Sequence, residues 1–139
     1  MTTLYDTDFA EWATQQANRL RNGDYADLDV ANIAEEIESL GKAQKRELAS
    51  RLATILEHLL KLHCDLESPA ANKWRRTILI QRNYLSIMLE DNATLAANVG
   101  DYLPKAYRNA VEQVALITKC QVDDFAQVCP WTVSEVLRA

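Results

Sequence analysis

The side chains best suited to chemistry lie in the middle of the chain, on segments whose apolar pattern predicts helices. His58 and His63 stand five residues apart, which separates them by roughly 140° on a helix and keeps them from sharing one ion. Zinc sites usually combine imidazole and thiolate at short spacings, and no HExxH, ExxH or CxxC spacing is present. The sequence therefore predicts no metal and no cofactor.

A second candidate is a cluster of polar side chains on the flanks of the predicted apolar stripes. Carboxylates, guanidinium groups and an imidazole at these positions could meet where helices join. Two interpretations stay open: an ion-pair network that fixes helix register, or a binding or catalytic pocket. The cluster consists of Glu36, Arg51, His58, Arg75 and Arg82.

A third candidate is the basic run Lys73-Trp74-Arg75-Arg76. A tryptophan among arginines can stack on a base while the arginines hold phosphates. However, Trp74 also begins an apolar stripe that continues through Ile78 and Leu85, which favours burial in the core. The net charge of −5 argues against broad, non-specific nucleic-acid binding.

The charge is unevenly distributed along the chain. Residues 24–38 contain six acids and no base, whereas residues 73–82 contain four bases and no acid. The two segments can face each other inside one fold, or the acidic segment can form a surface for a partner.

The three cysteines lack paired spacing, so we expect inert thiols, no disulfide framework and a reducing compartment. The first residues, MTTLYDTD, do not resemble a signal peptide. No stretch of 18 apolar residues is present, so we expect a soluble, cytoplasmic protein without membrane contact.

The elements that must position these groups are helices. Ala, Leu, Glu, Arg and Gln are frequent, and only three glycines and three prolines interrupt the chain. We expect Gly41 to end or sharply bend the helix that begins near Asp29, and such a bend could bring Glu36 close to His58. Gly100 and Pro104 should divide the fifth helical region. The predicted helices span about 8–22, 29–40, 43–65, 70–90, 94–119 and 132–138.

These elements predict an all-α fold, an up-down helical bundle of about five helices plus a short C-terminal helix. At 139 residues the chain is long enough for one core, and we expect a single helical domain over residues 1–139.

Six pieces spread over nearly the whole chain carry a family resemblance. In chain order they are YDTDFAEWA (5–13), LDVANIAEEIESLGKAQKRELASRL (28–52), HLLK (58–61), WRRTI (74–78), Tyr107-Arg108-Asn109-Ala110 and CPWTVSEVL (129–137). With these pieces the chain resembles domain-of-unknown-function family 29, a bacterial and largely cyanobacterial family. The resemblance implies a helical bundle and no particular activity.

The sequence favours a non-catalytic protein-interaction or assembly module over an enzyme, because no catalytic motif is present and the charges are segregated. Its partner would be another protein or a second copy of the chain. One alternative is a helical-bundle enzyme or metal-binding protein with a polar site near Glu36, His58 and Arg82. A second alternative is a nucleic-acid-associated regulator.

Overall fold

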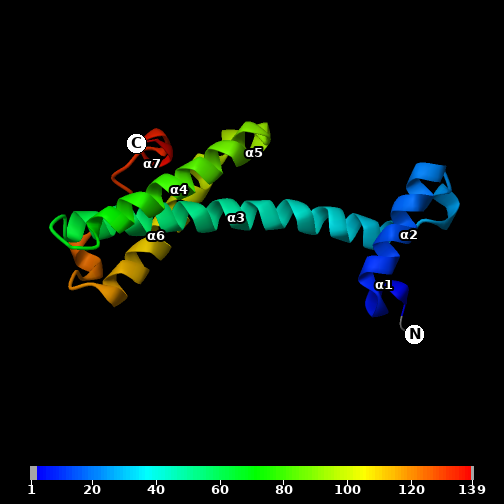
Figure 1. Cartoon of the computed structure of the whole chain (residues 1–139), viewed down its shortest axis with the longest axis horizontal. Helices are drawn as coiled ribbons and strands as arrows, with labels where there is room; N and C mark the ends of the chain where they lie inside the picture. Colours follow the sequence, from blue (N-terminus) through cyan, green and yellow to red (C-terminus); the bar gives the residue numbers. More distant parts are fainter. Residues whose placement is uncertain (1–2, 139) are drawn as a thin grey trace. The chain divides into compact units, whose positions relative to one another are not determined.

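Helices account for nearly all of the regular structure in the computed structural model, which describes residues 3–138 (Figure 1). The described residues contain no strand, so the predicted all-α class is confirmed. None of the helices described there is both long and apolar enough to cross a membrane. The elements are α1 (Leu4–Thr7), α2 (Phe9–Asn22), η1 (Tyr25–Asp27), α3 (Val30–Cys64), α4 (Ala71–Glu90), α5 (Ala93–Ala97), α6 (Val99–Ile117), η2 (Val122–Asp124) and α7 (Val133–Leu137).

Helix α3 runs without interruption through Gly41, so the break predicted there is wrong. A glycine inside a helix costs only about 1 kcal/mol relative to alanine, and strong helix formers on both sides of Gly41 outweigh that cost. Along an unbroken helix, Glu36 and His58 stand about six turns apart, at 3.6 residues per turn. The bend that was to bring them together is therefore absent.

The chain divides into two compact units, Met1–Gln44 and Lys45–Ala139, and each is described by itself. In the first unit, α1 and α2 pack against the start of α3. The indole Nε1 of Trp12 donates to Asp29 Oδ2 at 3.0 Å, and the backbone N–H of Asp29 donates to Gln16 Oε1 at 2.8 Å. Gln16 is only 4% exposed, and this hydrogen bond gives its buried side-chain oxygen a donor.

The ends of α2 show how the local sequence selects the helix boundaries. Asp8 accepts a hydrogen bond from the backbone N–H of Glu11 at 3.1 Å and caps the start. Gly23 ends the helix in the left-handed conformation, with φ of 76°.

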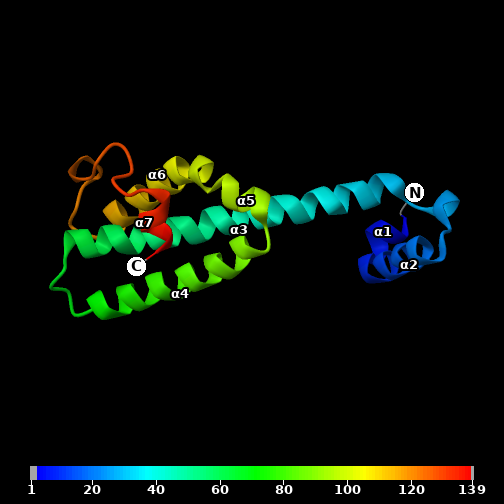
Figure 2. The ribbon, with the colours of Figure 1, turned by 90° about the horizontal axis from the view of Figure 1, so that it is seen from above.

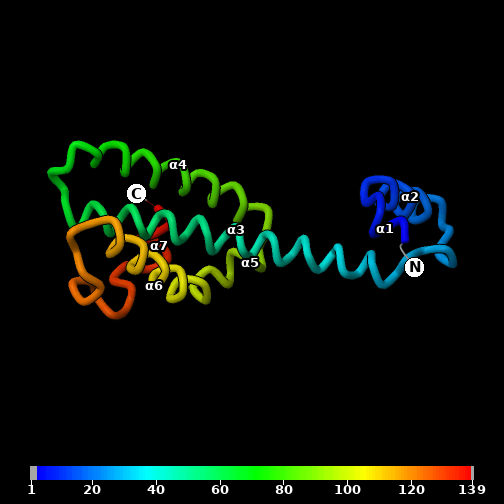
Figure 3. The backbone as a smooth tube through the Cα atoms, turned by 90° about the horizontal axis from the view of Figure 1, so that it is seen from below, coloured from blue at the N-terminus to red at the C-terminus, as the bar shows by residue number. Residues whose placement is uncertain are grey.

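In the second unit, the C-terminal part of α3 lies between α4 and α6, and α4 runs opposite to both (Figures 2 and 3). The short helix α7 contacts α4 and α6, and α5 connects these two helices. The core of this unit draws buried apolar side chains from every helix in it: Leu48, Leu52, Ile55, Leu56, Leu60, Ile78, Leu85, Leu95, Val99, Leu103, Tyr107, Val111, Val114, Phe125 and Val136.

The fifth helical region divides at Asn98, not at Gly100 and Pro104 as predicted. Both residues lie inside α6, where Pro104 occupies the second turn. The proline lacks the N–H that would bond to the carbonyl of Gly100, and the helix tolerates this single loss. A capping box begins α7, since Thr132 Oγ1 accepts from the N–H of Glu135 and the Glu135 carboxylate accepts from the N–H of Thr132.

Candidate functional site

Arg51 joins α3 to α4 and makes three contacts there. Its Nη1 donates to Gln81 Oε1 at 2.8 Å, and its Nη2 lies 3.0 Å from the carboxylate of Glu47. The guanidinium also stacks over the ring of Tyr84, 4.2 Å from its centroid. The hydrogen bond to Gln81 and the stacking on Tyr84 join the two helices, whereas the ion pair with Glu47 lies within α3.

Arg82 holds α7 against α4. Its Nε donates to the carbonyl of Val136 at 2.9 Å, and its Nη2 donates to the carbonyl of Glu135 at 3.0 Å. These carbonyls lie in the last turn of a helix, where no helical amide follows to bond them. Burial lowers the pKa of Arg82, and the two carbonyls accept hydrogen bonds from its guanidinium.

The remaining three members of the cluster each have one hydrogen-bond partner. The ring Nδ1 of His58 lies 2.8 Å from the carbonyl of Thr54, so Nδ1 carries the proton. Arg75 donates to Asn72 Oδ1 at 3.0 Å, one turn earlier in α4. Glu36, in the first unit, accepts a hydrogen bond from the hydroxyl of Tyr5.

Among the described residues, the structure records no hydrogen bond or ion pair between any two of the five predicted cluster residues. Each of the five has a partner outside the cluster, and the two with the most contacts, Arg51 and Arg82, join one helix to another. A catalytic or binding role for Glu36, His58 and Arg82 together stays a prediction that these contacts do not support. Over residues 3–138, no three His, Cys, Asp or Glu side chains are grouped so that they could hold a metal ion.

The hydrogen bond between Tyr5 and Glu36 changes the pKa of Tyr5. The sequence gave no indication of this bond. The carboxylate of Glu36 accepts from the phenol and would repel a phenolate, which raises the pKa of Tyr5 to about 12. The carboxylate of Asp29 shifts in the other direction, because hydrogen bonds from Asn32 and Trp12 lower its pKa. Both groups stabilise the packing of α1 and α2 on α3.

Two of the three cysteines are paired, which corrects the expectation of inert thiols. Cys64, at the end of α3, forms a disulfide with Cys120, just after α6, with 6.7 Å between their Cα atoms. The two residues are 56 positions apart, so sequence spacing gave no sign that they meet. Cys129 is free and half-buried, and burial raises the pKa of its thiol. A thiol with a raised pKa stays protonated near neutral pH and is a poor nucleophile.

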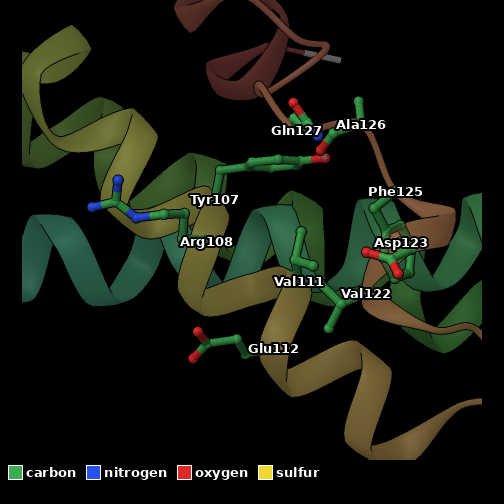
Figure 4. Close-up of a pocket in the computed structure, with 9 residues that line it drawn as sticks. All are labelled: Tyr107, Arg108, Val111, Glu112, Val122, Asp123, Phe125, Ala126 and Gln127. Carbon is green, nitrogen blue, oxygen red and sulfur yellow. Dashed lines mark hydrogen bonds between the residues drawn. The ribbon is translucent and has the colours of Figure 1, made fainter.

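A cavity that sequence reasoning missed lies between α6 and residues 122–127 (Figure 4). Its volume is about 460 Å³, and the hydroxyl of Tyr107 donates to the carbonyl of Ala126 at 2.7 Å beside it. Arg108 and Glu112 lie on the α6 side in Figure 4, across from Asp123. These charges do not converge on one point, so the cavity has no evident catalytic geometry.

The most unusual surface of the first unit is apolar. We define the α3 stripe as Ile33, Ile37 and Leu40, which share one face of the helix at spacings of four and three. Ile37 is 64% exposed and Leu40 is 69% exposed. Every residue from Leu40 to Glu47 is exposed, so about two helical turns of α3 have no covering element among the described residues.

A second apolar surface lies on α4. We define the α4 outer face as Lys73, Arg76, Ile80, Tyr84 and Ile87, which follow each other at steps of three or four residues. This face points away from the buried Ile78 and Leu85 of the same helix. Ile87 is 63% exposed and Ile80 is 41% exposed. Helix α4 is therefore apolar on two faces, and only one of them packs into the core.

Comparison with known proteins gives one match. The family model described as "Domain of unknown function DUF29" matches residues 4–139. No curated protein and no solved structure shows a significant match. The match covers both compact units, and the description that accompanies it assigns no activity.

Proposed function

The chain belongs to the DUF29 family, whose description assigns no activity, and we propose from its own surfaces that it is a non-catalytic protein-interaction module. Its contact surface in this proposal is the α3 stripe. A protein partner packs on that stripe and covers the two exposed turns of helix that follow it.

The observation that carries the proposal is the exposure of large apolar side chains on a regular helix face. Isolated exposed leucines are common, but a contiguous apolar row on an otherwise uncovered helix is typical of an interaction site. Ile37 and Leu40 would both move out of water when a partner helix packs beside α3. At about 25 cal/mol per Å² of apolar surface, two such side chains supply roughly 2–4 kcal/mol toward binding.

The alternative use of the chain's polar residues as a reactive site has less support. Arg51 and Arg82 form hydrogen bonds that hold helices together. The raised pKa of Cys129 makes its thiol a poor nucleophile. A surface that contributes contacts and no reacting group is what an interaction module needs.

Photo-crosslinking tests the proposal. A photoreactive phenylalanine analogue replaces Leu40 in one variant and Ile37 in a second, and the crosslinked species is identified by mass spectrometry from the cells that make the chain. Lys42 is the matched control, because it is two residues from Leu40 and about 200° around the helix. We expect one protein to be captured from positions 37 and 40 and not from position 42. Equal capture from all three positions, or capture of nothing, contradicts the proposal.

A cytoplasmic location is part of the proposal and needs its own test. The free thiol of Cys129 suits a reducing compartment, whereas the Cys64–Cys120 pair suits an oxidising one. Thiol trapping after acid quenching and denaturation of the cells separates these possibilities, since a reducing cytoplasm should open the Cys64–Cys120 bond and leave all three cysteines as reactive thiols in the denatured chain. Trapping of Cys129 alone would contradict a cytoplasmic location.

A further inference from the structure

We propose that the partner of the α3 stripe is the α4 outer face of a second copy of this chain. The inference rests on the proposed interaction function and names its partner. Each copy carries one stripe and one outer face, so two copies can exchange both contacts around a two-fold axis and form a closed dimer.

Charge complementarity selects a second copy over other partners. The first unit, Met1–Gln44, has nine acids and three bases, which gives it a net charge of −6. Helix α4 has four bases and one acid, which gives it a net charge of +3. Contact between the α3 stripe of one copy and the α4 outer face of another therefore brings opposite charges together.

The two surfaces also match in their apolar pattern. Both are helix faces on which large side chains recur every three or four residues, the spacing that lets ridges on one helix fit grooves on another. Glu36 lies beside Ile33 and Ile37 on α3, and Lys73 and Arg76 precede Ile80 on α4. Each surface thus has an apolar row with charge of one sign next to it, and the signs are opposite.

Arg51 packs at the edge of the α4 outer face. It belongs to α3, but its guanidinium lies over the ring of Tyr84, which is 55% exposed. Its hydrogen bonds to Gln81 and Glu47 hold it there. Because the Glu47 carboxylate already pairs with this guanidinium, Arg51 holds the Tyr84 ring in place and leaves the positive charge of the face to Lys73 and Arg76.

Charge reversal with rescue tests the proposal. The stripe variant carries Ile37→Lys and Leu40→Lys, and the face variant carries Ile80→Glu and Ile87→Glu. The four replaced side chains are exposed in the single chain, so the fold should survive. In the stripe variant, lysines meet the bases of α4, and in the face variant, glutamates meet the acids of the first unit. Each change should weaken self-association roughly 10-fold or more.

Mixing the two variants provides the rescue. In the mixed dimer, the new lysines of one chain meet the new glutamates of the other, and the second contact of the pair is unchanged. Sedimentation velocity should therefore show association in the mixture and little in either variant alone. Leu116→Lys with Val128→Lys is the matched control, since these side chains are 80% and 79% exposed and lie outside both surfaces. That control should associate like the wild-type chain.

The outcomes separate this inference from the proposed function. A wild-type chain that stays monomeric at every concentration overturns the second-copy proposal, and so do variants that associate normally or a mixture that does not. If a different, identified protein is still captured from positions 37 and 40 in that case, the interaction function stands. If nothing is captured there, the interaction function fails as well.

Discussion

Two alanine substitutions at glycines of the first unit should have effects of opposite sign. Gly41 lies in the interior of α3, and a Cβ added there meets nothing within 4 Å. Gly41→Ala therefore gains helix propensity without a steric cost, and should stabilise the chain by about 1 kcal/mol. Gly23 also has open space around it, but its φ is 76°. Gly23→Ala must force an alanine into the left-handed conformation, which costs about 1–2 kcal/mol.

The measurement is the free energy of unfolding in urea, followed by far-UV circular dichroism at one low protein concentration. A low concentration is needed because Gly41 borders the α3 stripe, and self-association through that stripe would add to the measured free energy of unfolding. Hydrogen exchange adds a local readout: about 1 kcal/mol of added helix stability slows exchange of the backbone amides of residues 40–47 about fivefold.

The opposite signs make the pair informative. Both variants remove one glycine from the same unit, so a general effect on the unfolded chain would move them together. A loss of stability for Gly41→Ala would refute the continuous helix and support a break at this residue. A gain for Gly23→Ala would refute the left-handed end of α2.

The remaining predictions concern packing, the anchoring of α7, and pH. Leu52→Ala empties a fully buried position between packed helices and should cost about 3–5 kcal/mol of unfolding free energy in urea; a cost below about 1 kcal/mol would contradict its place in the core. Arg82→Met removes the donors to two carbonyls of α7 and should cost about 1–3 kcal/mol, with faster hydrogen exchange in residues 133–137 and unchanged exchange in α2. The pKa of Tyr5 is raised to about 12 from an ordinary value of 10, so its contribution to stability is fully present below pH 10 and is lost as the pH rises from 10 to 12. Tyr5→Phe should abolish that pH dependence and remove the latest step of the tyrosine absorbance titration; an unchanged titration would contradict the hydrogen bond to Glu36.

The sequence predicted the helical class and most helix positions because apolar periodicity reports directly on which face of a helix is buried. Leu48, Leu52, Ile55, Ile78 and Leu85 all occupy the core as that pattern requires. The pattern does not distinguish a face that packs inside the chain from a face left free. Ile37 and Leu40 also show helical apolar spacing on α3, and they are exposed.

Gly41 shows a second limit. Propensity assigns a local cost of about 1 kcal/mol to glycine, and this cost is small against the cooperative gain from helix on both sides. Local propensity alone does not indicate whether the helix breaks at Gly41 or continues through it. Pro104 led to the same kind of error, because a proline within a helix is tolerated when few bonds are lost.

The residues of the predicted polar cluster have partners that the sequence did not indicate. Arg51 and Arg82 are partly buried, and their partners on other helices are Gln81, Tyr84 and the carbonyls of α7, which the sequence alone could not identify. The disulfide and the cavity beside Tyr107 depend on contacts between residues far apart in the chain. Such contacts carry no periodic signal in a single sequence.

The most direct test of the central claim, that the α3 stripe is a contact surface, is the crosslinking yield at position 40 relative to position 42 in living cells. The two positions are neighbours on the same exposed turn of α3 and differ in the face they occupy. A discrete, identified product at position 40 and none at position 42 is the predicted result. Equal yields at the two positions would show that no partner prefers the α3 stripe over the opposite face of the helix, and would contradict the account.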